Sequence, residues 1–284
     1  MNNKSLADCY HEMVDETVNK IAEFKKIMTE GLFDLAFQPI VEAISGEVSH
    51  FEVLTRLRGQ TSFANPFQFI EFGENMGLIP DYDMKVVARV LEILGEYKKI
   101  GIEPSICINL SGNSLSSQIF MDNLYALISA EPELCKQLVF EITESARVTS
   151  IKNVNEYFHK LRELGIQCSI DDFGTGEATF EYLRHLHVDY VKIDGSYITP
   201  EAISTEHGRH LLRALSLLCA DMGIDVVAER VENQQAADIL VEYGIKYGQG
   251  YFYAKPTIDL EILKVTKLAA ASSAEITNIN QYKN

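Results

Sequence analysis

Apolar runs of strand length alternate with longer amphipathic stretches along most of the chain. The strand-like runs lie at residues 35–42, 48–58, 105–111, 137–145, 167–174, 188–195, 224–232 and 247–256. Helix-like stretches at 153–165, 210–223 and 236–244 separate the later runs, and each ends in glycine. This alternation predicts a mostly parallel sheet with crossover helices. Eight such strands favour closure into an α/β, TIM-like (β/α)8 barrel.

The first two strands are joined differently from the others. Only a short turn around Ser45 and Gly46 separates them, whereas a parallel connection needs a crossover of about a dozen residues or more. We therefore expect the first strand to run antiparallel, so that the barrel has one reversed strand. The helical pattern that follows the second strand, at about residues 66–99, is long enough for two helices.

Two segments of different character flank the barrel pattern. Apolar residues recur at helical spacing through residues 5–30, and Gly31 is placed to end that helix. The pattern fits a lead-in or signalling helix, and it fits equally a helix that covers the bottom of the barrel. We expect an N-terminal helix at 1–31, the barrel at 32–258, and a C-terminal helix or tail at 259–284.

Composition narrows the classes of function. The 284 residues are 46% hydrophobic and 23% charged, which is ordinary for a globular domain with a sizeable core. The formal net charge of −16 argues against general nucleic-acid binding, which depends on Lys and Arg contacts to phosphates. No run approaches the ~18 apolar residues of a membrane span, so we expect no membrane insertion. The five cysteines are scattered, which predicts reduced thiols and a cytoplasmic protein.

Most of the predicted strands end in a charged or amide side chain. These residues are Glu52, Asn109, Glu141, Asp171 with Asp172, Lys192, Glu229 and Gln249. The carboxyl ends of barrel strands form the active-site face, so five carboxylates would converge on one opening. Their repulsion in a partly dry site is costly unless cations offset it, and Lys192 alone cannot. Carboxylate and amide oxygens suit hard ions such as Mg²⁺ or Mn²⁺, and an Asp-Asp pair can bridge two ions.

The histidines argue against a different kind of catalysis. All seven lie outside the predicted strand ends, and His185 and His187 lie in a helix-to-strand connection, where surface or packing roles are expected. Nucleophilic catalysis by a Ser-His or Cys-His pair is therefore poorly supported. A metal-bound hydroxide, assisted by a lysine or a glutamate, is the better nucleophile.

The motifs at the strand ends, taken together, resemble those of the EAL domain family. They are EVLTR at 52–56 after QPIV at 38–41, INLS at 108–111, FEITES at 140–145, DDFGTG at 171–176, VKID at 191–194, AERVE at 228–232 and QGYFYAKP at 249–256. Their order and spacing match an EAL domain across about residues 32–258. Any one motif is weak, whereas DDFGTG with the others in order is highly specific.

The resemblance implies a cyclic-guanylate-specific phosphodiesterase. Such an enzyme hydrolyses one phosphodiester bond of cyclic di-GMP to linear pGpG, with two Mg²⁺ or Mn²⁺ ions. The implied metal ligands are Glu52, Asn109, Glu141, Asp171, Asp172 and Glu229. The implied catalytic and supporting residues are Lys192, which orients or activates the attacking water, Glu229, a general-base candidate, Gln249, which holds the water network, and Glu144, which anchors the DDFGTG loop.

The resemblance also implies contacts to the substrate and between copies of the chain. Arg56 matches a phosphate contact, and Gln38 and Pro256 lie where the bases of the substrate would pack. Glu232 matches a supporting acid near Glu229. Family members often dimerise through the helix near the DDFGTG motif, so the resemblance is compatible with a homodimer, and the oligomeric state stays open.

Three departures from the family pattern bear on these expectations. Val53 replaces the signature alanine, and its side chain should point away from the face of Glu52 because neighbours on a strand alternate. Arg230 stands where glycine is usual, at a flanking position where we expect it to be tolerated. Residues 177–180 replace the usual stretch after DDFGTG, which puts the rate or the dimer contact in question.

Two other functions remain open. One is an inactive or weakly active EAL domain that senses cyclic di-GMP or binds a protein partner; such domains usually lose some of the metal ligands, and here the matched ligands are present. The other is a different metal enzyme on a barrel, such as an enolase-like lyase, which the order of the motifs disfavours. A nucleotide-product assay separates these functions: release of pGpG supports the phosphodiesterase, tight binding of cyclic di-GMP without turnover supports the sensor, and inertness toward any phosphodiester supports the other metal enzyme.

Overall fold

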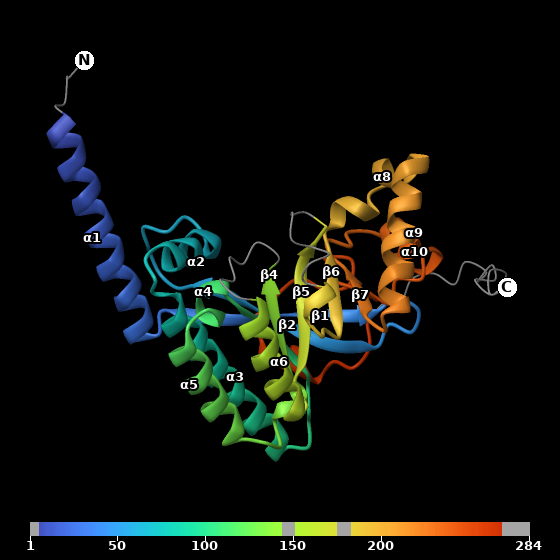
Figure 1. Ribbon diagram of the computed structural model, residues 1–284, viewed down its shortest axis with the longest axis horizontal. Helices are drawn as coiled ribbons and strands as arrows, with labels where there is room; N and C mark the ends of the chain where they lie inside the picture. Colours follow the sequence, from blue (N-terminus) through green and yellow to red (C-terminus); the bar gives the residue numbers. More distant parts are fainter. Residues whose placement is uncertain (1–5, 144–150, 175–182, 269–284) are drawn as a thin grey trace.

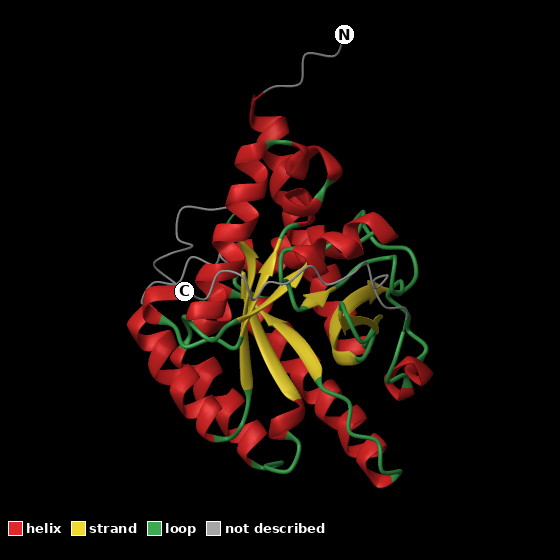
Figure 2. Ribbon diagram, turned by 90° about the vertical axis from the view of Figure 1, so that its right-hand side faces the viewer, coloured by secondary structure: helices red, strands yellow, loops and turns green. Residues whose placement is uncertain are grey.

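The strands close into a barrel in sequence order. The computed structural model describes residues 6–143, 151–174 and 183–268. The barrel runs β1-β2-β3-β4-β5-β6-β7-β8, and helices surround it (Figure 2). The strands are β1 Phe33–Glu42, β2 Val48–Leu57, β3 Ile106–Leu110, β4 Leu138–Thr143, β5 Gln167–Phe173, β6 Tyr190–Ile193, β7 Asp225–Ala228 and β8 Tyr247–Gly248. Each lies within or beside one of the runs predicted as strands.

The reversed first strand is confirmed. β1 pairs antiparallel with both β2 and β8, whereas the remaining neighbours pair in parallel. The turn between β1 and β2 contains Gly46 at φ 74°, a conformation that glycine adopts without the steric cost other residues bear. The reversal puts the first residues of β1 beside the carboxyl end of β2, where Phe33 pairs with Leu57.

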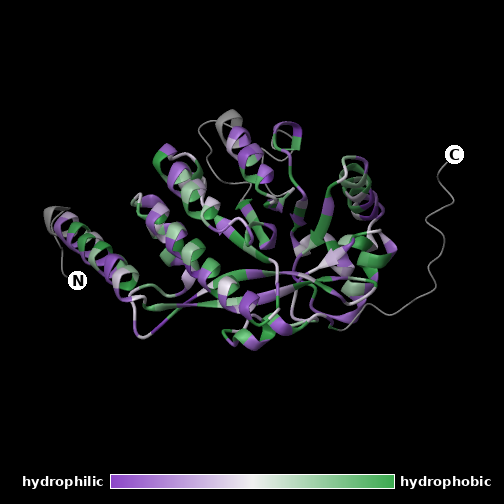
Figure 3. Ribbon diagram, turned by 90° about the horizontal axis from the view of Figure 1, so that it is seen from below, coloured by the Kyte–Doolittle hydropathy of each residue, from purple (hydrophilic) through white to green (hydrophobic). Residues whose placement is uncertain are grey.

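Most of the helices lie between successive strands and cover the outside of the barrel (Figure 1). They are α1 Leu6–Glu30, α2 Pro66–Asn75, α3 Ile79–Lys99, α4 Gly112–Leu115, α5 Gln118–Ser129, α6 Ile151–Glu163, α8 Pro200–Ser204, α9 Glu206–Asp221 and α10 Gln234–Glu242. Short 3-10 turns lie at Cys135–Gln137, Gly195–Ile198 and Leu260–Lys264. The stretch at 66–99 forms two helices, as predicted, with Gly77 at φ 68° between them. Hydrophobic and hydrophilic residues alternate along the helices (Figure 3).

Within the described ranges, the buried apolar residues form two clusters. The larger cluster lies between the outer face of the barrel and the helices, and it includes Val53, so the prediction that Val53 points away from the face of Glu52 is confirmed. The smaller cluster consists of inward-facing residues: Ile40, Cys107, Val139, Tyr190 and Val227. Because side chains alternate along a strand, the residue two positions further on each strand also faces the barrel interior.

Helix α1 extends away from the barrel (Figure 1). Its last turns are anchored, because Phe24, Ile27 and Met28 are buried. The ring of Phe24 stacks on Phe69 of α2 with centroids 4.3 Å apart. The half before this anchor leaves large apolar side chains exposed, including Tyr10. The proposed domain boundary at residue 31 stays a prediction.

The last described residues return to the first hairpin. Phe37 of β1 exchanges backbone hydrogen bonds with Thr257, and Glu47 bridges to Lys267. This places the segment after β8 against β1. Among the described residues, no helix combines the length and the apolar character needed to cross a membrane.

Candidate metal centre and active site

A layer of polar side chains lies directly above the apolar layer inside the barrel. On β3, Asn109 follows the buried Cys107 by two residues, and on β4, Glu141 follows Val139 in the same way. The sheet register pairs Asn109 with Glu141 directly. The alternation of strand side chains therefore turns the polar strand ends predicted from the sequence into one inward-facing layer.

Lys192 lies at the centre of this layer. Its side chain is 1% exposed. Its ammonium nitrogen lies 2.7 Å from a carboxylate oxygen of Glu229, 2.8 Å from one of Glu141, 3.3 Å from one of Glu52 and 3.4 Å from one of Asp171. Four strand ends thus place their carboxylates around one buried cation.

Glu52 is held by amide groups as well as by Lys192. Asn109 donates to one carboxylate oxygen of Glu52 at 2.8 Å, and Gln249 donates to the other at 2.6 Å. The same Gln249 amide lies 3.3 Å from the side-chain oxygen of Gln38, whose own amide donates to the backbone carbonyl of Ala254. These hydrogen bonds connect β1, β2, β3 and the end of β8, and they fix the orientation of the Glu52 carboxylate.

A backbone irregularity brings Asp171 and Asp172 to the same opening. Consecutive residues of a regular strand point in opposite directions. The pairing of β5 with β6 shifts register between Ile170 and Phe173, and Asp172 has φ 56°. Aspartate tolerates this left-handed conformation better than most residues, and such bulges commonly re-aim side chains next to active sites. Asp171, Asp172 and Glu229 consequently place carboxylate oxygens within 4.8 Å of one another.

The donor set fits hard divalent cations. The three clustered carboxylates, with Glu52, Asn109 and Glu141 beside them, offer oxygen ligands of the kind that Mg²⁺ and Mn²⁺ prefer. Oε1 of Gln249 is buried and accepts no hydrogen bond from the described residues, and Oδ1 of Asp171 has the 3.4 Å ion pair with Lys192 but accepts no hydrogen bond from them. Buried acceptors are normally satisfied, so these atoms have free capacity for a ligand.

Burial and the neighbouring charges shift the pKa values of the central residues in opposite directions. Burial alone would lower the pKa of Lys192, but the surrounding carboxylates, Asp171 first among them, raise that pKa well above its ordinary value. Burial alone would raise the pKa of Glu52, yet Lys192 and the amides of Gln249 and Asn109 lower it. Lys192 is therefore charged at neutral pH, and Glu52 is its ionised partner.

Glu141, Glu229 and Asp172 have raised pKa values. Burial raises the pKa of Glu141 well above its ordinary value, because the offsetting charge of Lys192 is smaller than that effect. Burial also raises the pKa of Glu229, and burial together with Asp171 raises the pKa of Asp172. One lysine thus cannot keep all of these acids ionised at ordinary cost, and bound divalent cations would supply the missing positive charge.

Some residues expected at the site form no hydrogen bond or ion pair with this cluster among the described residues. Arg56 is half-buried and donates to the adjacent carbonyl of Thr55. Pro256 is half-buried in the segment that pairs with β1, and Glu232 is exposed. Glu144 and residues 177–180 lie outside the described residues.

Two inward-facing residues of the site were not assigned a role from the sequence. Burial, with the charge of Lys192, lowers the pKa of His50 to about 3, so this histidine adds no positive charge below the cluster. The buried thiol of Cys107 lies 3.3 Å from a carboxylate oxygen of Glu141. The signal was present, because His50 precedes Glu52 by two residues and Cys107 precedes Asn109 by two.

Arg230 has an unusual backbone conformation. Its φ is 54°, in the left-handed region that favours glycine, and its guanidinium lies 3.3 Å from a carboxylate oxygen of Asp194. Arg230 is accommodated here, as expected, but it bears the steric cost of a left-handed backbone conformation, which the sequence did not reveal. The conformation also explains why β7 stops at Ala228, short of the predicted strand end at residue 232.

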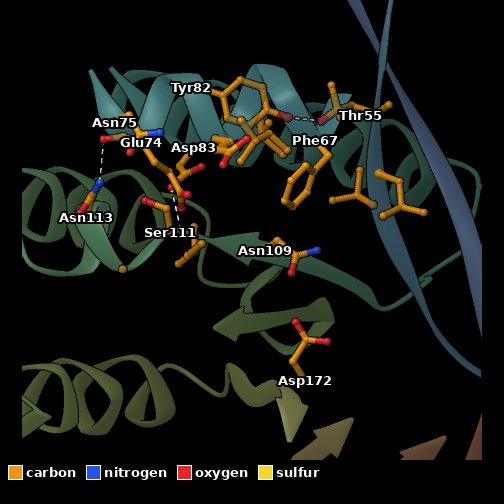
Figure 4. Close-up of a pocket in the computed structure, with 18 residues that line it drawn as sticks. Thr55, Phe67, Glu74, Asn75, Tyr82, Asp83, Asn109, Ser111, Asn113 and Asp172 are labelled. Carbon is orange, nitrogen blue, oxygen red and sulfur yellow. Dashed lines mark hydrogen bonds between the residues drawn. The ribbon is translucent and has the colours of Figure 1, made fainter. Parts of the chain in front are cut away.

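A groove of about 630 Å³ opens beside the metal centre. Asn109 and Asp172 line one part of it, and Phe67 and Glu74 of α2 and Asp83 of α3 line another (Figure 4). A volume of this size is typical of small-molecule sites. The strand ends and α2 thus enclose one continuous space that reaches the predicted metal ligands.

Known proteins share both the sequence and the fold. The family model described as EAL domain matches residues 22–256. The cyclic di-GMP phosphodiesterase PdeB of Shewanella oneidensis is 35% identical over 226 residues, which cover 78% of this chain and 26% of that protein. The cyclic di-GMP phosphodiesterase PdeF of Escherichia coli is 32% identical over 245 residues, covering 85% and 32%. The chain therefore spans only about a quarter to a third of the length of these relatives.

Solved structures give the same result. The EAL domain protein from Listeria monocytogenes EGD-e has a TM-score of 0.74 and 28% identity, covering 84% of this chain and 94% of that chain. The FimX EAL domain has a TM-score of 0.76 and 26% identity, covering 84% and 96%. With a family model that matches most of its length, the chain belongs to the EAL domain family.

Proposed function

We propose that this chain hydrolyses one phosphodiester bond of cyclic di-GMP to give linear pGpG. The observation that carries the proposal is the inward-facing layer in which carboxylates from four strand ends surround the buried Lys192. A purely structural role leaves this concentration of buried charge unexplained, because it is costly unless the site binds cations. The names of the relatives, cyclic di-GMP phosphodiesterases, support the choice of substrate.

The ion ligands in this proposal are Glu52, Asn109, Glu141, Asp171, Asp172 and Glu229. Two divalent cations, Mg²⁺ or Mn²⁺, would supply Lewis acidity and offset the negative charge of the phosphodiester. The oxygen-only donor set supports this assignment, as does Oδ1 of Asp171, which accepts no hydrogen bond from the described residues.

The residues of the chain have separate roles in the proposed reaction. Lys192 is a proton donor in hydrogen bonds at neutral pH, because its carboxylate neighbours raise its pKa, and it orients the attacking water. Glu229 has a raised pKa, which suits a general base that takes a proton from this water. Gln249 holds Glu52 and the water network through its amide.

Contacts to the substrate complete the proposal. Arg56 binds a phosphate once its side chain leaves the Thr55 carbonyl, and Gln38 and Pro256 pack beside a base. Gln38 is already hydrogen-bonded to Gln249, which connects this contact to the metal centre. The role of Glu144 in anchoring the DDFGTG loop stays a prediction from the family resemblance. The homodimer and the cytoplasmic location stay predictions.

A nucleotide-product assay tests the function. Purified protein is incubated with cyclic di-GMP and Mg²⁺ or Mn²⁺, with a parallel sample in excess chelator, and the products are separated by chromatography. We expect pGpG only when the divalent ion is present. Tight binding of cyclic di-GMP without turnover would instead identify a sensor, and inertness toward cyclic di-GMP in both binding and turnover would reject the proposal.

The role of Lys192 has its own test. Lys192→Ala should lower kcat far more than it weakens substrate binding, because the lysine acts on the water and not on the bases. Equal losses in kcat and in binding would remove this role.

A further inference from the structure

Helix α2 has two faces that contact different parts of the molecule. Phe69 and Gly73 are buried on one face, where they pack against Phe24 of α1. The opposite face carries Phe67, Ile70, Glu71 and Glu74 at the i, i+3, i+4, i+7 spacing of one helix face, and all four line the groove. The helix therefore presents a second face to the space beside the metal centre, on which Ile70 packs against the core and Phe67 stays exposed.

Phe67 is the unusual member of this face. It is 72% exposed, although it is a large aromatic residue, and its ring points into the groove (Figure 4). Its position is fixed, because Asn65 caps the start of α2 by accepting a hydrogen bond from the backbone N–H of Gln68, and Pro66 occupies the first turn. A flat apolar surface is thus held at the rim of a groove that reaches Asn109 and Asp172.

The charges in the groove decide which part of a nucleotide can enter it. Glu71, Glu74 and Asp83 line the groove, and none of its described lining residues is a lysine or an arginine, so the groove offers a phosphate no positive charge. Burial and the neighbouring Glu71 raise the pKa of Glu74, but an acceptor oxygen remains in either protonation state. The edge of guanine presents N–H donors, which carboxylate oxygens accept, whereas the corresponding ring nitrogen of adenine is an acceptor. Phosphates therefore belong at the metal centre, and a guanine base belongs in the groove.

We propose that the ring of Phe67 stacks on a guanine base of the substrate and so positions the phosphodiester at the metal centre. This inference rests on the proposed function for the identity of the nucleotide. Stacking on an aromatic side chain needs only a flat ring held at the right place, which the capped first turn of α2 provides. Phe67 touches the base and not the reacting atoms, so it contributes to binding equally in the ground state and the transition state.

A single tryptophan can report this contact, because the chain contains no tryptophan. In Phe67→Trp the indole takes the place of the phenyl ring, and a stacked guanine quenches its emission. The matched control is Tyr10→Trp, which replaces another exposed aromatic residue on the free half of α1. Both variants are titrated with cyclic di-GMP and with cyclic di-AMP in Mn²⁺, under conditions too brief for turnover. We expect saturable quenching by cyclic di-GMP in Phe67→Trp, a weaker effect of cyclic di-AMP, and none in Tyr10→Trp.

Steady-state kinetics supply an independent readout. Phe67→Ala should raise KM for cyclic di-GMP by about 5- to 150-fold, the range given by the loss of one stacked base, with kcat nearly unchanged. Tyr10→Ala should change neither constant. A structural role for Phe67 would instead lower the folded fraction and reduce the apparent kcat.

The outcomes separate this inference from the proposed function. Equal quenching in both tryptophan variants, or an unchanged KM in Phe67→Ala with full turnover, would overturn the stacking role and leave the phosphodiesterase intact. Quenching confined to Phe67→Trp in a protein that produces no pGpG would support the stacked base and reject catalysis.

Discussion

Replacement of Lys192 by methionine tests the electrostatic account of the site most directly. The substitution removes the charge and keeps an unbranched side chain of similar length in the barrel. In the described structure, the ammonium makes its two shortest contacts with Glu229 at 2.7 Å and Glu141 at 2.8 Å. Removal of one partner of a buried ion pair typically costs about 3–5 kcal/mol, because the remaining charges stay buried without compensation. We expect a loss of this size in the free energy of unfolding when the protein is free of metal.

Divalent ions should reduce the deficit. Lys192 and the ions compete for the same carboxylates, so the variant should bind Mn²⁺ more tightly than the wild type does. Binding to the folded state stabilises it, and the deficit should narrow by about 1.4 kcal/mol for each tenfold gain in affinity. If Lys192 and the ions both offset the charge of the carboxylates, the free energy of unfolding must depend less on Lys192 when the ions are bound.

Urea denaturation at neutral pH, in excess chelator and in saturating Mn²⁺, measures both effects. Lys246→Met is the matched control, because Lys246 pairs with Asp225 at 2.7 Å with both side chains well exposed. Exposed pairs contribute about 0–1 kcal/mol, so this variant should change little in either condition. A Lys192→Met protein as stable as the wild type in chelator, or a deficit that Mn²⁺ leaves unchanged, would refute the reasoning.

Three further predictions follow from individual residues. Burial raises the pKa of Asp83 from 3.8 to about 7. The hydrogen bonds from Ser111 N–H and from the Ser114 hydroxyl both reach the same carboxylate oxygen of Asp83. The side-chain oxygen of an asparagine can accept both of them. A raised folded-state pKa means that stability falls as pH rises from the unfolded value through the folded one. Asp83→Asn should therefore match the wild type at about pH 4 and be more stable above about pH 7, by up to about 4 kcal/mol; equal urea midpoints at both pH values would contradict this. Arg230→Gly should raise the free energy of unfolding by about 0.5–1 kcal/mol, because relief of the left-handed strain exceeds the added chain entropy. The lost ion pair offsets little of this gain, since its guanidinium is 69% exposed and the Asp194 carboxylate keeps its hydrogen bond from Ser196 N–H. A lower urea midpoint would show the strain to be absent. Glu52→Ala should abolish pGpG production while circular dichroism shows the fold retained, and full activity would remove the residue from the ligand set.

The fold was largely predictable because burial imposes simple periodicities. Apolar runs with crossover stretches specified the strands, and the short link at Ser45 and Gly46 specified the reversed one. The same periodicity explains why Glu52, Asn109 and Lys192 face one another, since each lies two positions from another inward-facing residue.

Features that depend on single backbone angles or on chain crossings were not predictable. The bulge at Asp172 and the positive φ of Arg230 leave no trace in hydrophobic periodicity. The eighth strand was expected to reach residue 256, yet it ends at Gly248. After Gly248 the chain turns and passes close to the residues that follow β7. A side-chain carbon added at Gly250 would lie 2.1 Å from the carbonyl oxygen of Val231. The second face of α2 was missed because its partner is a groove and not another element.

Helices α1 and α2 pack as closely as their side chains allow. A side-chain carbon added at Gly73 would come within 2.8 Å of the ring of Phe24, so the two helices meet at the closest approach that a glycine allows. Gly73→Ala should therefore tilt α2, and the emission of a Phe67→Trp reporter should reveal the tilt even without nucleotide. Helix α2 is short, and it contacts the anchor of α1 on one face and carries the Phe67 ring on the other. We expect a displacement of the α1 anchor to shift α2 and with it the Phe67 ring, which would change the affinity for a stacked nucleotide while the predicted metal ligands at the strand ends keep their positions.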